Sequence, residues 1–314
     1  MITSRSRHNT AVLLKRATFA SVSVAVILIC GKLLAWLMTG SLSILASLVD
    51  SLMDAAASTV NLIAIRYSLK SADDEHRFGH GKAEFLAGLA QASFIAGSAF
   101  FLVFHAVERL RNPEPIKDVT AGVTMMVIAI AVTLVLLLYQ RRVIKRTDST
   151  AIRADALHYA TDLVTNLGTI VALVLATTGW PGLDPVFAIL IAIYIFYSAC
   201  KISYTSAQML MDHELPLEIR EQIDRVARMP PQVKGVHDIR TRRSGQTMLI
   251  QLHLELDDQM PLLQAHGIAK AVEKEILRTG PDADVIIHQD PVEFCRKTQL
   301  RHDANNPSPG PKQG

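Results

Sequence analysis

The sequence contains six apolar stretches, each about as long as a helix that crosses a lipid bilayer. A bilayer core of about 30 Å requires roughly 20 helical residues with few charges. Half of all residues are hydrophobic and 19% are charged, below the roughly 25% charged residues of soluble domains. We therefore predict an α-helical membrane protein with six transmembrane helices, at residues 17–38, 43–65, 85–104, 119–140, 157–177 and 185–209.

The composition argues against several other classes of protein. A net charge of +3 without an aromatic and basic cluster does not indicate a nucleic-acid partner. The three cysteines are far apart and form no CxxC pair, which argues against a disulfide framework or a cysteine-built zinc module. The sequence has no GxxxxGK[ST] motif, so ATP-driven pumping is not expected.

Lysine and arginine residues predict the orientation of the helices. They gather in the N-terminal segment and in the second and fourth connections, and the first and fifth connections have none. Cytoplasmic loops carry such an excess. We therefore expect a multi-pass protein with both termini in the cytoplasm.

The composition becomes more polar after residue 211, which predicts a second domain. Two amphipathic helical patterns and three strand patterns follow in the order αββαβ, at residues 217–229, 236–242, 247–256, 262–278 and 284–290. This order is typical of a small α+β domain with its helices on one face of a sheet. The predicted parts are a cytoplasmic segment (1–16), a transmembrane domain (17–211), a cytoplasmic metal-binding domain (212–295) and a disordered tail (296–314).

Four ionisable residues lie inside the predicted membrane spans. Asp50 and Asp54 are four residues apart in the second span, and His158 and Asp162 are four apart in the fifth. Each pair therefore shares one helix face. An Asp at the centre of a membrane helix costs roughly 2.5–3.5 kcal/mol on insertion scales, so such residues usually have a function.

The helical rise predicts that these pairs meet. At 1.5 Å per residue, Asp50 and Asp54 lie about 14 and about 20 Å from the outer end of their span. His158 and Asp162 lie about 12 and about 18 Å from the inner end of theirs. In a core of about 30 Å, Asp50 matches Asp162 in level and Asp54 matches His158, near the midplane.

Three carboxylates and one imidazole suit a borderline divalent metal such as Zn²⁺. Without the ion the site would hold three negative charges, a state that protons neutralise, which predicts exchange of metal for protons. The alternative is a set of structural polar residues paired with Lys32.

Several segments resemble the cation diffusion facilitator family, and within it the bacterial zinc and ferrous-iron efflux members. The matching segments are residues 43–58 (SILASLVDSLMDAAAS), 73–84 (DDEHRFGHGKAE), 154–166 (ADALHYATDLVTN), 264–266 and 285–291 (VIIHQDP). The resemblance extends over about residues 10–295. It implies six membrane helices, a ferredoxin-like cytoplasmic domain, a homodimer, metal/proton antiport and a bacterial inner membrane. It also implies that the transport site is Asp50, Asp54, His158 and Asp162, with Fe²⁺ and Cd²⁺ open beside Zn²⁺.

Histidines outside the spans suggest further metal sites. Asp73, His76 and His80 lie in one polar connection, where a solvated loop is the alternative. Asp74 and Glu75 are possible substitute ligands there. In the second domain, His288 and Asp290 share a strand face and His253 lies on the polar face of another strand. The resemblance implies a weaker metal site in the connection and a binuclear zinc site, bridged by Asp290, formed by His237, His253, His266, His288 and Asp290.

The resemblance also implies two structural roles. Lys82 and Asp212 match a charge interlock between the membrane and cytoplasmic parts, and Leu157 matches an apolar gate position. In the third span, small residues at Gly88, Ala92, Ala96 and Ala99 predict close helix packing.

We therefore predict a secondary active transporter, and no enzyme, that exports divalent metal by alternating access. The first alternative is a membrane-anchored metal sensor without transport. The second is a membrane metalloenzyme, which the sequence disfavours because Leu217 stands where an HExxH motif starting at His213 would need its second histidine.

Overall fold

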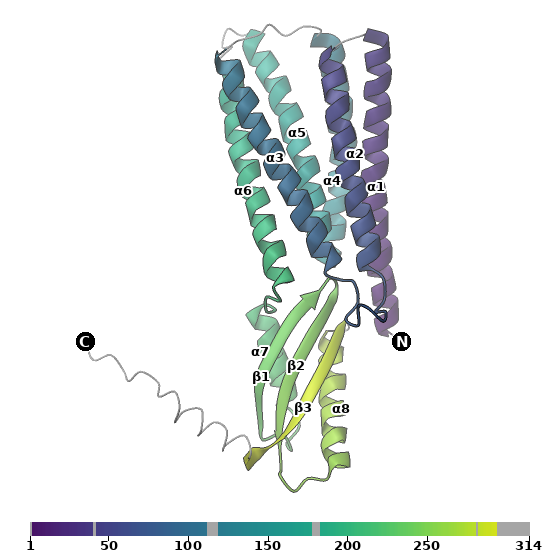
Figure 1. The fold of residues 1–314 in the computed structure, drawn as a ribbon, viewed down its shortest axis with the longest axis vertical. Helices are drawn as coiled ribbons and strands as arrows, with labels where there is room; N and C mark the ends of the chain where they lie inside the picture. Colours follow the sequence, from purple (N-terminus) through teal and green to yellow (C-terminus); the bar gives the residue numbers. More distant parts are fainter. Residues whose placement is uncertain (1, 40–41, 112–118, 178–182, 281, 294–314) are drawn as a thin grey trace, which may run out of the picture. The chain divides into compact units, whose positions relative to one another are not determined.

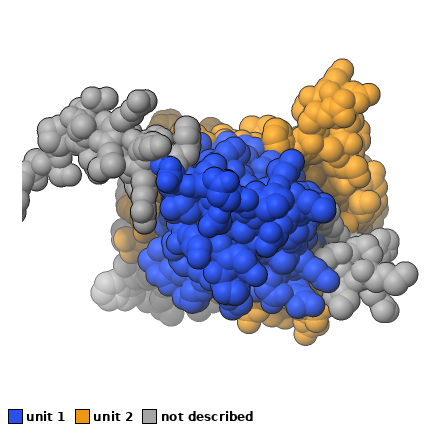
Figure 2. All heavy atoms as spheres, turned by 90° about the horizontal axis from the view of Figure 1, so that it is seen from below, with its two compact units in different colours: residues 1–6, 212–314 blue, residues 7–211 orange. Residues whose placement is uncertain are grey.

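The computed structural model describes all residues except 1, 40–41, 112–118, 178–182, 281 and 294–314. The chain divides into two compact units, coloured separately in Figure 2, of which one comprises residues 7–211 and the other residues 1–6 and 212–314. The predicted disordered tail, residues 296–314, lies outside the described residues.

The first unit consists of long helices that run side by side (Figure 1). The shortest has 27 residues, which at 1.5 Å per residue spans about 40 Å and exceeds the bilayer core. The helices are α1 (Ile2–Thr39), α2 (Leu42–Ser68), α3 (Ala83–Arg111), α4 (Val119–Thr147), α5 (Thr150–Thr177) and α6 (Leu183–Leu210).

Five of these helices are apolar enough over their described length to cross a membrane: α1, α2, α3, α4 and α6. The remaining helix, α5, carries Asp155, His158 and Asp162 on its described part. It packs against α2, α3, α4 and α6. Polar side chains on α5 therefore face other helices, where they find partners that lipid does not offer.

Small residues on α3 let it approach α6 closely, as predicted. Ala99 and Ile95 form a buried cluster with Ile195 and Ala199 of α6. A Cβ atom added at Gly88 would lie 2.9 Å from Ser206 Oγ and 3.1 Å from Thr150 Cγ2. Glycine at this position thus permits the contact of α3 with both α5 and α6.

The second unit is a three-stranded sheet with two helices, in the predicted αββαβ order. The elements are α7 (Leu217–Ala227), β1 (Gly235–Ser244), β2 (Thr247–Leu256), α8 (Leu262–Thr279) and β3 (Ala283–Pro291). The central strand β2 pairs antiparallel with β1 and parallel with β3.

Both helices of the second unit pack on one face of the sheet. Ile250, Leu252 and Leu254 of β2 form the core together with residues of α7 and α8, such as Ile223 and Val272. Because side chains alternate along a strand, the residues between them, including His253, lie on the opposite face. The predicted fold class, a helical transmembrane domain followed by a small α+β domain, is confirmed.

Replacing Gly88 by leucine should destabilise the helical unit. The new side chain would collide with Ser206 and Thr150, and such overpacking costs about 1–3 kcal/mol. Thermal unfolding of the detergent-solubilised protein measures the effect. The matched control is Gly97→Leu on the same helix, where an added Cβ meets nothing within 4 Å. Equal stability of the two variants would contradict the close approach at Gly88.

Candidate metal centres

The first candidate site lies between α2 and α5 and contains three of the four residues predicted for it. His158 Nε2 lies 3.0 Å from Asp54 Oδ1. Asp54, His158 and Asp162 each offer a ligand atom, and these three atoms lie within 4.8 Å of one another. The His158 side chain is only 9% exposed. The contact agrees with the predicted match in level between Asp54 and His158.

The fourth predicted ligand, Asp50, lies one helical turn before Asp54 on α2. Within the described part of the chain it is not in the close group of three, and it is exposed. Its carboxylate still interacts electrostatically with the ammonium of Lys32, as do those of Asp54 and Asp162. Asp50 as a direct ligand stays a prediction.

Lys32 is held by α2 rather than by an aspartate. Its Nζ donates to the carbonyl oxygen of Ser47 at 3.0 Å and to Ser51 Oγ at 2.6 Å. The alternative of a structural cluster closed by an ion pair to Lys32 therefore has no support in the hydrogen bonds of this side chain. One cation beside three carboxylates leaves the group net negative, as a site for a dication requires.

The predicted gate residue Leu157 packs between helices. It lies against Ile95 and Ile195 in one apolar cluster and against Ala92 and Ala154 in another. This packing places an apolar side chain directly before His158 on α5. The role of a gate stays a prediction.

The second candidate site is the connection between α2 and α3. Asp73 Oδ2 lies 3.2 Å from His80 Nε2, and Asp73 Oδ1 lies 3.4 Å from His76 Nδ1. The two imidazole centroids are 4.6 Å apart. Gly79, with φ +77°, forms a turn before His80 that residues with a side chain rarely adopt.

Backbone N–H groups hold Asp73 in its charged form. The N–H of His76 donates to Asp73 Oδ1 at 2.7 Å, and that of Glu75 donates at 3.2 Å. The His76 bond is the main reason that the pKa of Asp73 lies below its ordinary value. Asp74, suggested as a substitute ligand, instead pairs with Arg77 at 3.0 Å.

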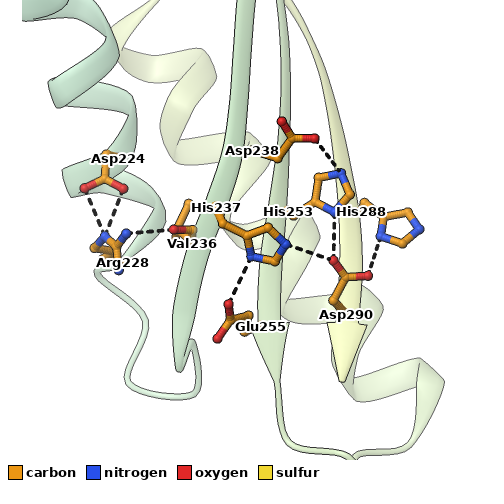
Figure 3. A network of polar contacts seen from close by, with 9 residues as sticks. All are labelled: Asp224, Arg228, Val236, His237, Asp238, His253, Glu255, His288 and Asp290. Atoms are coloured by element: carbon orange, nitrogen blue, oxygen red, sulfur yellow. Dashed lines mark hydrogen bonds and ion pairs between the residues drawn. The ribbon is translucent and has the colours of Figure 1, made fainter. Parts of the chain in front are cut away.

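The third candidate site is a row of histidines across the sheet of the second unit (Figure 3). His237 of β1 pairs in register with His253 of β2, which pairs with His288 of β3. Neighbouring rings along the row are tilted by 39° and 37°, with centroids 5.1 and 4.6 Å apart. Strand register thus brings together three imidazoles that are far apart in the sequence.

Asp290 connects the three histidines. Its Oδ2 lies 2.7 Å from His253 Nδ1 and 3.4 Å from His237 Nε2, and its Oδ1 lies 2.6 Å from His288 Nδ1. The Asp290 side chain is 11% exposed. Three imidazoles and one carboxylate within this space fit a Zn²⁺ ion, which takes nitrogen and oxygen ligands in tetrahedral geometry.

Hydrogen bonds keep Asp290 ionised in this site. Partial burial acts to raise the pKa of Asp290, but the bond from His253 and the charge of His288 outweigh it, so the pKa lies below its ordinary value. A depressed pKa in the folded state contributes stability at a pH above the ordinary value, about 3.9. That contribution is lost as the pH falls through the folded value.

His266, also predicted for this site, is elsewhere. It lies on the exposed side of α8, and α8 covers the sheet face formed by Leu252 and Leu254, whereas His253 belongs to the other face. The close group of described residues is His237, His253 and Asp290, with His288 bonded to Asp290. His266 as a ligand stays a prediction.

Two acidic residues beside the histidine row were not predicted. Glu255 Oε1 lies 3.0 Å from His237 Nδ1, and a side chain at Gly235 would collide with this carboxylate. Asp238 lies in a β-bulge with φ +48°, and its Oδ2 lies 3.8 Å from His253 Nε2. Glu255 shares the alternation of His253 and was detectable from the sequence, whereas the bulge was not.

The predicted interlock residues belong to different units. Lys82 donates to the carbonyl oxygen of Leu210 at 3.2 Å. Asp212 accepts a hydrogen bond from Arg242 at 3.0 Å. Each residue thus has a partner in its own unit, and the interlock stays a prediction.

Comparisons with known proteins identify the family of the chain. The family model of the cation efflux transmembrane domain matches residues 18–211, and that of the cation efflux protein cytoplasmic domain matches residues 215–292. The chain belongs to the cation efflux family, also called cation diffusion facilitators. This membership confirms the resemblance, and the chain is therefore a multi-pass membrane protein for metal cation efflux, a transporter rather than an enzyme.

Curated relatives cover nearly the whole chain. It is 50% identical over 279 residues to the cation-efflux pump FieF of Citrobacter koseri, which is 89% of this chain and 93% of the relative. The same identity and coverage hold for the FieF pump of Klebsiella pneumoniae. The metal-bound C-terminal domain of the CzcD transporter from Thermotoga maritima is 32% identical, covers 24% of this chain and 90% of its own, and has a TM-score of 0.24. The family model of the cytoplasmic domain is named for dimerisation, which agrees with the expected dimer.

Replacing Asp290 by asparagine should weaken zinc binding in the histidine row. Asparagine offers a neutral oxygen in place of the carboxylate that all three histidines contact, and we expect a loss of at least about 10-fold in affinity. Competition with a chromogenic chelator on the full-length protein measures it. The control is Asp224→Asn, which alters only the pair with Arg228 on α7 (Figure 3). An unchanged affinity in Asp290→Asn would show that the row is not a metal site.

Proposed function

We propose that the protein exports Zn²⁺ from the cytoplasm in exchange for protons. The ion binds between α2 and α5, at Asp54, His158, Asp162 and Asp50. The observation that supports this most directly is the 3.0 Å contact of His158 with Asp54, with Asp162 within 4.8 Å. Ionisable side chains from two membrane helices gather there in a buried place, as a cation pathway requires.

The donor set favours a borderline metal. An imidazole with carboxylates suits Zn²⁺, and Fe²⁺ and Cd²⁺ remain further substrates of the same site. Mg²⁺ and Ca²⁺ prefer larger shells of oxygen ligands. The curated relatives are named cation-efflux pumps, without a metal in the name.

Charge balance supports the exchange for protons. With a dication bound beside the Lys32 ammonium, the three carboxylate charges are balanced, and departure of the dication leaves a net charge of −2 in the group. Protons neutralise an emptied site at low dielectric, so each transport cycle would return protons to the cytoplasmic side. The proton gradient then supplies the driving force, and the transport is secondary active.

The site is suited to alternating access because its ligands come from two helices. Asp54 belongs to α2, and His158 and Asp162 belong to α5. A change in the relative position of these helices would open the site to one side of the membrane and then to the other. The apolar packing of Leu157 would close the path next to His158.

The histidine row of the second unit would have a role in the assembly of a dimer. We place both termini and the second unit in the cytoplasm, with the chain in the bacterial inner membrane as a homodimer. Zinc in the histidine row would neutralise Asp290 and Glu255, reduce repulsion between neighbouring copies and so stabilise the dimer. The loop site of Asp73, His76 and His80 would bind metal more weakly because two of its three residues are exposed.

Asp54→Ala should abolish zinc transport. The variant removes the carboxylate that contacts His158. Mutation of a residue that only supports a metal ligand lowers affinity or activity about 10–100-fold, and loss of a direct ligand should lower it further. Zinc uptake into proteoliposomes of the purified protein measures it, and Asp224→Ala in the second unit is the control. Unchanged uptake in Asp54→Ala would favour the membrane-anchored sensor.

Collapse of the pH gradient should stop uphill zinc transport. In everted vesicles a protonophore removes the driving force while leaving the metal site intact, so zinc uptake against its gradient should fall to the passive level. Zinc accumulation is followed with a trapped fluorescent indicator. Uphill uptake that continues without the gradient would refute the proton coupling.

A further inference from the structure

A second buried acid, Asp155, lies on α5 one turn before His158. Its side chain has no solvent exposure, although α5 begins only five residues earlier. No metal cluster of the described residues includes it. Burial of an ionised carboxylate is expensive unless a cation pairs with it. The partners of Asp155 therefore determine its protonation state.

Among the described residues, the hydrogen bonds to Asp155 come from neutral groups on two other helices. Ser21 Oγ of α1 donates to Asp155 Oδ2 at 2.5 Å, and Gln140 Nε2 of α4 donates to the same oxygen at 2.7 Å. Gln140 Nε2 also donates to Ser21 Oγ at 3.0 Å. From α2, the side-chain amide of Asn61 faces the carboxyl, and on α5 the carboxyl interacts electrostatically with His158.

The buried layer has more acceptors than donors. Asp155 Oδ1, Gln140 Oε1 and Asn61 Oδ1 are all buried without a hydrogen-bond partner among the described residues. A proton on Asp155 would turn one of these acceptors into a donor and remove a buried negative charge. Both effects favour the neutral acid in the conformation described.

Hydrogen bonds of Tyr159 join the helices that carry this layer and the metal site. Tyr159, next to His158, donates its hydroxyl to the carbonyl oxygen of Ser21 at 2.9 Å. The same hydroxyl lies 3.0 Å from Ser58 Oγ, and Ser58 is one turn after Asp54 on α2. Along α5, Asp155 and His158 are only about 4.5 Å apart in axial rise. A dication at the metal site would thus act strongly on a proton held by Asp155.

We propose that Asp155 is a further proton-binding site, which holds a proton while the metal site is empty and releases it when a dication binds. The inference rests on the proposed metal/proton exchange. In the release step the O–H bond of the acid breaks, its electron pair stays on the carboxylate, and the proton passes to water. The carboxylate formed offsets part of the added positive charge. Departure of the metal reverses the step.

The test counts the protons released when zinc binds. Calorimetric titration of the full-length protein in buffers of different ionisation enthalpy gives this number. Asp155→Asn keeps the shape of the side chain and an oxygen that can accept from Ser21 and Gln140, but it has no acid. The variant should therefore release roughly one proton fewer per transport site than the wild type. The loop and cytoplasmic sites are the same in both proteins and cancel in the difference.

Two variants serve as matched controls. Asp155→Glu retains an acid at this position. Gln140→Leu changes a neighbour of Asp155 but leaves Asp155 itself in place. Both variants should therefore release as many protons as the wild type. Equal proton release by Asp155→Asn and the wild type would overturn the proposal. If zinc-linked proton release is lost in Asp54→Ala but unchanged in Asp155→Asn, the metal site stands and only the role of Asp155 fails.

Infrared spectroscopy provides a readout that does not need a folded Asp155→Asn variant. The zinc-bound minus zinc-free spectrum of the wild type should lose the carbonyl band of a protonated carboxylic acid. Gln140→Leu should shift this band, because Gln140 donates to Asp155 Oδ2. A difference spectrum without such a band, or with a band that Gln140→Leu leaves unshifted, would overturn the assignment.

Discussion

The contact between His158 on α5 and Asp54 on α2 is the interaction on which the membrane unit depends. Ionisable groups in a membrane segment must find partners within the protein, because lipid provides none. This requirement keeps α2 and α5 adjacent and turns the polar side of α5 toward its neighbours α2, α3, α4 and α6. The close approach of α3 at Gly88 and the hydrogen bond that the N–H of Thr150 donates to Glu84 Oε1 fix the beginning of the same helix. Packing far from the metal site thus positions it.

Asp155, His158 and Asp162 of α5 belong to two layers with different chemistry. The layer of His158 and Asp162 gathers with Asp54 as a group of potential metal ligands. The layer of Asp155 contains neutral donors from α1 and α4 and several acceptors without partners. If α5 carried only the first layer, every change in protonation that accompanies metal binding would have to occur on the ligands themselves. A protonated acid one turn away can undergo part of that change by releasing its proton.

Local patterns predicted much of the fold and part of each candidate site. The rise of an α-helix sufficed to place Asp54 at the level of His158, and strand alternation placed His253, His288 and Asp290 on exposed faces. The alignment of His237, His253 and His288 depends on strand register, which single strands do not determine. Asp155 was missed because the apolar run that marks a membrane span begins at Leu157, whereas the helix begins at Thr150. Among the described residues Asp50 and His266 lie outside the close groups of ligand atoms, because residue type and spacing alone do not determine the position of a side chain.

The two best-formed candidate sites differ in the rigidity of the elements that carry them. Three adjacent, hydrogen-bonded strands hold the histidine row, so the separation of its ligands is set by the sheet and cannot change without breaking strand pairing. The membrane site joins two helices through side chains, and within the described residues no backbone hydrogen bond between α2 and α5 would need to break for its ligands to separate. A rigid site retains an ion, whereas a site between separable helices can release it. Efflux requires release, and this difference supports the proposal that the ion is transported at the pair of helices and that the sheet site has a structural or regulatory role.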